Sequence, residues 1–88
     1  MSHDENTMRS KIRQFIESNM NVDDDVELQD DDNIFSKGYV SSIFAMRLLT
    51  FLENLAGISV ADDDIVLPNF STVDAMIGLI NKSRAGAA

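Results

Sequence analysis

Apolar residues near the start of the chain recur at steps of three and four, which is the spacing of one face of an α-helix. The charged residues between them fall on other sides of the same helix. We therefore predict a first helix over about 7–20, with Asn6 or Thr7 capping its first free amides. The residues that set the period are Met8, Ile12, Phe15, Ile16 and Met20.

The next twenty residues lose this period. Acidic runs at 23–25 and 30–32 are interrupted by single apolar residues. A connection of this length is unusual in a compact domain unless it is disordered or functional. The spaced apolar residues indicate a loop that is pinned to the core, and Gly38 is placed to adopt a positive φ where the chain turns. These apolar residues are Val26, Leu28, Ile34, Phe35 and Val40.

A second helix is predicted over about 42–56, where most residues are apolar. Arg47, Thr50 and Asn54 form its one narrow polar stripe. Such a helix is buried around most of its circumference or presents apolar surface to a partner. Gly57 occupies the position of a C-terminal cap. We expect an inward face made of Ile43, Met46, Leu49 and Leu52.

The last part of the chain predicts one short and one longer helical segment. Residues 62–64 suit a single helical turn before Pro68, and an apolar stripe predicts the final helix over about 72–82. Ser71 and Asp74 have the spacing of a capping box at its start. The pattern as a whole predicts an all-α fold, a small three-to-four-helix bundle with a long first loop.

The 88 residues suffice for one domain, which we place at 7–82, with flexible ends at 1–6 and 83–88. Fifteen acidic residues against seven basic ones give a net charge of −8, which disfavours nucleic acid and favours partners with basic surfaces. The chain has no cysteine and no long apolar run, so we expect a cytoplasmic monomer with no disulfide and no contact with a membrane.

The residues give little support to metal binding or to serine catalysis. The acidic runs lack the glycine and the closing glutamate of an EF-hand loop, so we expect solvated acidic loops and no metal site. A serine nucleophile needs a nearby base, and the only histidine, His3, is remote in sequence from Ser41 and Ser42. We therefore expect that the protein is not an enzyme.

The two serines at the start of the second helix admit two interpretations. A serine there commonly caps a free amide. The same position also favours an anion such as a phosphodiester, because the free amides and the helix dipole point toward it. The surrounding pattern must decide between the two. It consists of Gly38, three intervening residues, Ser42 and then the aliphatic Ile43 at the head of an apolar helix.

This pattern resembles the attachment motif of acyl and peptidyl carrier proteins, and the order of elements is similar over about 7–82. The resemblance implies 4′-phosphopantetheine on Ser42, transferred from coenzyme A by a phosphopantetheinyl transferase, with acyl groups carried as thioesters on its thiol. Ser42 is favoured because Ile43 follows it, whereas Ser41 takes the place of the usual Asp or Asn. The expected fold is that of an acyl carrier protein.

The same resemblance implies partners such as an acyltransferase or a ketosynthase, meeting Ser41, Ile43, Phe44 and Arg47. For Phe44 both a core and a docking role are open, and docking is preferred. A finer similarity, over Ser42 to Met46, 51–53 and 69–75, is to stand-alone carriers that receive a glycerate-derived unit in polyketide pathways. The alternatives are a peptidyl or D-alanyl carrier, or an unmodified acidic helical adaptor that docks a partner helix.

Overall fold

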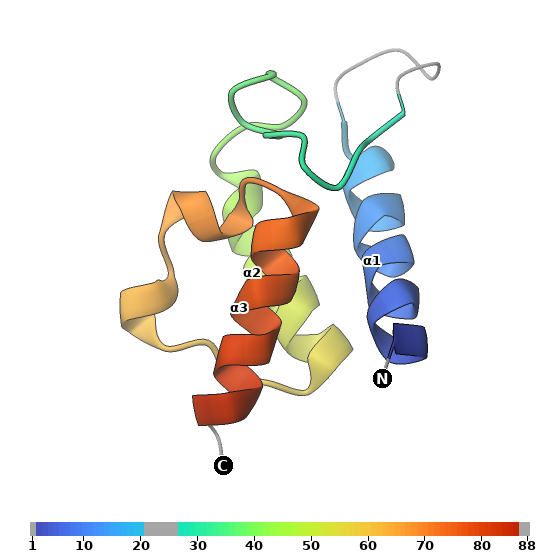
Figure 1. Ribbon diagram of the computed structural model, residues 1–88. Coiled ribbons are helices and arrows are strands. Elements are labelled where there is room, and N and C mark those ends of the chain that lie inside the picture. The colour runs from blue at the N-terminus through green and yellow to red at the C-terminus, as the bar shows by residue number, and fades with distance from the viewer. Residues whose placement is uncertain (1, 21–26, 87–88) are drawn as a thin grey trace.

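A computed structural model describes residues 2–20 and 27–86. Over these residues it contains three α-helices, two 3-10 helices and no strand. The α-helices are α1 (Ser2–Glu17), α2 (Phe44–Ala56) and α3 (Val73–Gly86), and the 3-10 helices are η1 (Asp62–Asp64) and η2 (Leu67–Phe70). In Figure 1, α2 and α3 run in one direction and α1 runs in the other. The predicted all-α bundle is confirmed.

All three helices contribute to one hydrophobic core. The long loop between α1 and α2 also reaches into it, because Leu28, Ile34 and Val40 are buried there. The expectation that this loop is pinned to the core is therefore confirmed, although Val26 and the acidic run at 23–25 lie outside the described residues. Side chains with almost no exposed surface include Ile12, Ile16, Leu48, Leu52, Phe70, Val73, Met76 and Ile80.

The first helix begins earlier than the apolar pattern predicted. Asn6 and Thr7 lie inside α1, so the prediction that one of them caps the helix is wrong. An ion pair between Glu5 and Arg9, 3.5 Å apart and one helical turn along the chain, helps to extend the helix toward Ser2. Such pairs stabilise a helix without contributing to an apolar period, and for this reason the period did not reveal the first turn.

The ends of α2 and α3 follow the sequence more closely. Gly57 has a left-handed backbone with φ of 64°, and its amide donates to the Glu53 carbonyl, so the predicted C-terminal cap is confirmed. At the start of α3 the capping residue is Thr72, whose hydroxyl accepts a hydrogen bond from the Ala75 amide at 2.9 Å. The predicted capping box of Ser71 and Asp74 is wrong, because the Ser71 hydroxyl donates to the Pro68 carbonyl. α3 also runs past the predicted end at residue 82.

The inward face of α2 differs from the predicted one. Phe44, Leu48 and Leu52 are buried, whereas Ile43 and Met46 are 78% and 61% exposed. The physical reason lies on α1, where the ring of Phe15 stacks against the Phe44 ring with centroids 5.4 Å apart. Because most residues of α2 are apolar, its sequence alone does not determine which side of the helix faces the core. The contact between Phe15 and Phe44 determines it. None of the helices in the described residues has the length and apolar content needed to cross a membrane.

Candidate modification site at the start of α2

A tight turn at Gly38 delivers the chain to the start of α2. Gly38 has φ of 74°, in the left-handed region that favours glycine, as its place in the sequence predicted. The amides of Tyr39 and Val40 both donate to the Ile34 carbonyl, at 3.0 and 3.3 Å. Val40 is buried, so the backbone is fixed in position immediately before Ser41.

The same loop is tied to the start of α3. The Ile34 amide donates to the Ser71 carbonyl at 2.8 Å, which joins the loop to the residue just before the capping Thr72. On the outer side of the loop, the Asn33 side-chain oxygen accepts hydrogen bonds from the amides of Phe35 and Ser36. The loop is therefore held both by its own bonds and by α3.

The first turn of α2 is closed by backbone alone. The Phe44 amide donates to the Ser41 carbonyl at 3.0 Å and the Ala45 amide to the Ser42 carbonyl at 3.1 Å. No side chain of the described residues caps this helix. Both serines are exposed, so the Ser42 hydroxyl is accessible at the positive end of a 13-residue helix. The interpretation of these serines as helix caps is therefore wrong, because neither side chain caps α2.

The residues around Ser42 divide into an outer and an inner set. Ser41, Ile43 and Arg47 are exposed with Ser42, and no acidic side chain of the described residues forms an ion pair with Arg47. Phe44 does not belong with them. Its side chain is only 7% exposed, so the preference for Phe44 as a docking residue is corrected to a core role.

Met46, like Ile43, is an exposed residue that the sequence placed on the inward face of α2, and it was not among the predicted partner contacts. It lies four residues after Ser42, on the same side of α2 and one turn further along. Because side chains four residues apart lie on the same side of a helix, an exposed Ser42 could have indicated that Met46 is exposed as well. Ile43 and Met46 together place apolar surface next to the accessible hydroxyl.

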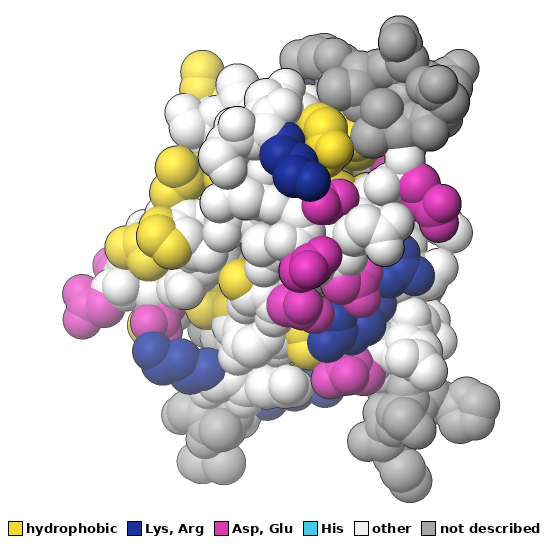
Figure 2. Space-filling view, turned by 45° about the horizontal axis from the view of Figure 1, so that its top comes forward, with side chains coloured by type: hydrophobic (Ala, Val, Ile, Leu, Met, Phe, Trp, Pro, Cys, Tyr) yellow, Lys and Arg dark blue, Asp and Glu magenta, His cyan; other side chains and the backbone are white. Residues whose placement is uncertain are grey.

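The start of α3, in contrast, is covered by an ion-pair network. Arg9 of α1 donates to Asp74 and, at 2.9 Å, to Asp30, while Arg13 donates to Asp30 at 2.6 Å. The backbone amide of Asp74 also donates to the Asp30 carbonyl. Figure 2 shows acidic and basic side chains adjoining on the face toward the viewer, whereas hydrophobic side chains gather toward the edge on the side of η1 and η2.

This network shifts the pKa of two of its members. Partial burial alone would raise the pKa of Asp30, but the hydrogen bonds from Arg13 and Arg9 outweigh burial and lower it. The pKa of Arg9 is raised, chiefly by its hydrogen bond to Asp74. Asp30 is therefore a carboxylate at neutral pH, and it joins α1 to the start of α3.

The remaining acidic side chains do not gather into a metal site. Asp32 has a lowered pKa because Lys37 donates to its carboxylate and the Gln29 amide donates to its second oxygen. Asp64 pairs with Lys82 at 2.7 Å. Among the residues that the structure describes, no group of three or more His, Asp or Glu side chains is placed to hold a metal ion.

No protein-family model, curated protein or solved structure matches this chain.

Proposed function

We propose that the protein is a discrete acyl carrier protein, with 4′-phosphopantetheine attached to Ser42. The observation that carries the proposal is the start of α2. There no described side chain caps the helix, and the exposed Ser42 hydroxyl follows a fixed turn at Gly38. The all-helical bundle and the resemblance of the segment from Gly38 to Ile43 to the carrier motif support it. The group, when bound, would supply a thiol that holds an acyl group as a thioester.

The residues of this chain would present the nucleophile and accommodate the product. In the transfer, the Ser42 oxygen forms a bond to the phosphorus of the pantetheine phosphate of coenzyme A, and the bond to the departing adenosine 3′,5′-bisphosphate breaks. The serine proton goes to a base of the transferase. The start of α2 suits the phosphodiester that results, because the positive end of a helix stabilises an anion.

Partner enzymes would meet the exposed residues around Ser42, which are Ser41, Ile43, Met46 and Arg47. A net charge of −8 favours basic partner surfaces. Arg47 sets this carrier apart from carriers whose second helix is lined with acids. We propose a role in a secondary metabolic pathway, with a glycerate-derived cargo as the specific hypothesis and peptidyl or D-alanyl cargo as alternatives.

Intact mass spectrometry after incubation with coenzyme A and a permissive phosphopantetheinyl transferase tests the proposal. The wild-type chain should gain the mass of one phosphopantetheine group. Ser42→Ala should gain nothing, while Ser41→Ala should be modified more slowly and the matched control Ser59→Ala at the wild-type rate. Full modification of Ser42→Ala would falsify the assignment.

The exposure of Ile43 and Met46 favours a second candidate function, that of an unmodified adaptor. Apolar side chains that protrude from a helix are the anchors by which one helix docks against another protein. The mass experiment separates the two functions. An adaptor would gain no mass with any transferase, and its partner would bind the Ser42→Ala variant as tightly as the wild-type chain.

A further inference from the structure

Two phenylalanine rings lie together at the surface between α1 and α2. The ring centroids of Phe15 on α1 and Phe51 on α2 are 4.2 Å apart, with 7° between the ring planes. Both side chains pack against the core, and neither is fully buried. Two pockets of about 510 and 480 Å³ share these rings, and both are open to solvent. The fold therefore leaves part of this aromatic surface uncovered.

The charges around these rings differ from those of the chain as a whole. No Asp or Glu lines either pocket, although the chain has fifteen acidic residues against seven basic ones. Lys11 lines one pocket and Arg47 the other. We call this surface, with Phe15 and Phe51, the cationic groove.

The two cations of the groove differ from the other basic side chains in their contacts. Arg9, Arg13, Lys37 and Lys82 each bind an acidic side chain, and Arg84 donates to the sulfur of Met8. Among the residues that the structure describes, Lys11 and Arg47 form no ion pair. The positive charge of the groove is thus available to a partner.

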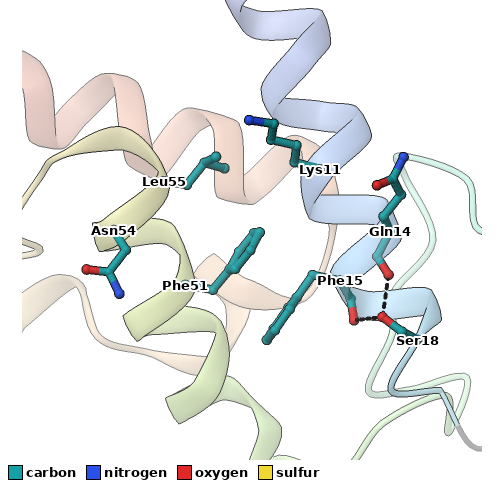
Figure 3. A pocket seen from close by; sticks show the side chains of 7 residues that line it. All are labelled: Lys11, Gln14, Phe15, Ser18, Phe51, Asn54 and Leu55. Atoms are coloured by element: carbon teal, nitrogen blue, oxygen red, sulfur yellow. Dashed lines mark hydrogen bonds between the residues drawn. The ribbon is translucent and has the colours of Figure 1, made fainter.

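The two cations lie at opposite ends of the groove, with the rings between them. α1 and α2 run in opposite directions, so earlier residues of α1 face later residues of α2 (Figure 1). Lys11 comes one turn before Phe15, and Figure 3 shows its amine on the side of Leu55, near the end of α2. Arg47 comes one turn before Phe51, in the pocket nearer the start of α2.

The spacing of these groups matches the side of a partner helix. Each cation lies four residues from the ring on its own helix, a rise of about 6 Å, and the two offsets run in opposite directions. Lys11 and Arg47 are therefore about 12 Å apart along the groove. Side chains at steps of four form a ridge along a helix, so the first, middle and last of three such residues also cover about 12 Å.

The chemistry of the groove favours an acidic partner of this kind. An apolar side chain in the middle of the ridge would cover the two rings, and a carboxylate at each end would lie beside a cation. Nucleic acid offers no such anchor, and its phosphates are repelled by a net charge of −8. An anionic membrane gains only about 1 kcal/mol from each cation, against the same net repulsion.

We propose that the cationic groove binds an acidic amphipathic helix of a partner protein. A leucine or phenylalanine of that helix packs against the rings of Phe15 and Phe51. Acidic residues one turn before and one turn after this anchor pair with Lys11 and Arg47. The inference goes beyond the proposed function, because this binding does not use the Ser42 hydroxyl, and it adds partners of a charge opposite to those that the net charge attracts.

An NMR titration of the unmodified wild-type chain with a synthetic peptide tests the proposal. The probe is an alanine-rich helical peptide with a central leucine and a glutamate one turn before and one turn after it. The ring-proton signals of Phe15 and Phe51 should shift, and those of Phe70, which is buried and lines neither pocket, should not. Unchanged Phe15 and Phe51 signals at about 1 mM peptide would overturn the proposal. Because the chain is unmodified, the result is independent of the mass experiment.

Matched charge reversals show whether the two cations bind the glutamates. Lys11→Glu and Arg47→Glu should each weaken peptide binding about fivefold, because each replaces an attraction by a repulsion. The control Arg84→Glu changes the net charge equally at an exposed position outside both pockets, and its binding should stay within about twofold of the wild type. Equal weakening in all three variants would show a response to net charge alone and would overturn the proposal.

Changes to the peptide test the same contacts without altering the fold. A peptide with lysines in place of both glutamates should bind the double variant Lys11→Glu, Arg47→Glu more tightly than the wild-type chain. Alanine in place of the leucine should weaken binding to the wild-type chain about tenfold, because the anchor is lost. The absence of either difference would contradict the proposed arrangement.

Two further outcomes would identify a different occupant. Phe15 and Phe51 signals that shift with protein concentration alone would indicate a second copy of this chain in the groove. Signals that shift with phosphatidylglycerol vesicles and not with the peptide would indicate a lipid surface. Either outcome would overturn the proposal of an acidic partner helix.

Discussion

The starts of α2 and α3 lie at the same end of the bundle, and the two are built in opposite ways (Figure 1). At α3, the Thr72 hydroxyl caps the helix, the Asp30 carbonyl accepts from the Asp74 amide, and Arg9 binds the Asp74 carboxylate. At α2, backbone bonds close the first turn, no described side chain caps it, and Ser42 is exposed.

Under the proposed function, the difference separates residues that stabilise the fold from residues that meet partners. Capping and ion pairing at α3 join three parts of the chain, namely α1, the long loop and α3 itself. The start of α2 contributes its buried Phe44 to the core and leaves its outer side free. Substitutions at α3 should therefore change the free energy of unfolding, and those on the outer side of α2 should change recognition by partners.

The largest expected effect is on stability, and it distinguishes the buried Phe44 from its exposed neighbour Ile43. Phe44→Ala should lower the free energy of unfolding by about 3–5 kcal/mol, because it leaves a cavity beside Phe15. Ile43→Ala, at an exposed position, should change it by less than about 0.5 kcal/mol. Urea denaturation of both variants measures the difference. An equal loss for Ile43→Ala would mean that the outer side of α2 is structural.

The next effect concerns the ion pairs that cover α3. Asp30→Asn should lower the free energy of unfolding at pH 7 by about 1–2 kcal/mol, since Arg9 and Arg13 both lose a charged acceptor. The pKa of Asp30 is lowered in the folded state, so its contribution is full above the unfolded pKa of about 3.9 and declines as the pH falls toward the folded pKa.

Denaturation between pH 7 and pH 3 tests the sign of this effect. The wild-type chain should lose more stability than Asp30→Asn on the acid side of about pH 4, and the gap between them should narrow there. Asp32, whose pKa is also lowered, should leave part of the acid dependence in the variant. A gap that stays constant down to pH 3 would contradict a role for the Asp30 carboxylate.

A smaller effect compares the two helix starts by the same kind of substitution. Thr72→Ala removes the only side-chain bond to the Ala75 amide in the described residues and should lower the free energy of unfolding by about 1 kcal/mol. Ser42→Ala removes a hydroxyl that caps nothing, so its thermal melt should coincide with that of the wild-type chain. A comparable loss in Ser42→Ala would show that Ser42 stabilises the helix.

The smallest expected effect is on recognition. Arg47→Glu should leave the melt unchanged and weaken binding of the cognate partner a few-fold, equivalent to about 1 kcal/mol or less for an exposed charge. Binding should also weaken as salt rises, because exposed charges are screened beyond about 8–10 Å at 0.1–0.15 M ionic strength. Titration calorimetry at two salt concentrations gives both results, and no response to either change would exclude electrostatic docking.

The features that the sequence predicted well are those decided by local backbone chemistry. Gly38 and Gly57 both adopt the left-handed conformation expected of them, because no other residue type adopts it so readily. The expected place of Ser42 at the start of the second helix follows from the same turn, although α2 itself begins at Phe44, two residues later than predicted. The acidic turn at Asp62–Asp64 was likewise predicted from its place before Pro68.

The features that were missed depend on contacts between distant segments. The rotation of α2 is set by Phe15 on α1, and an apolar helix without a wide polar face leaves that rotation open. The cap of α3 could have been Ser71 or Thr72, since both carry a hydroxyl, and the bond of Ser71 to Pro68 decides between them. The two pockets beside Phe15 and Phe51 are lined by residues from both α1 and α2, so no single stretch of sequence indicates them.

The hydrogen bond between the Ile34 amide and the Ser71 carbonyl also bears on the timing of events during synthesis. A growing chain that ends before Ser71 already contains Ser42 but lacks the acceptor that holds the loop. Contacts between residues so far apart in sequence form late in folding. The turn that precedes Ser42 would therefore reach its fixed position only after the start of α3 has been made.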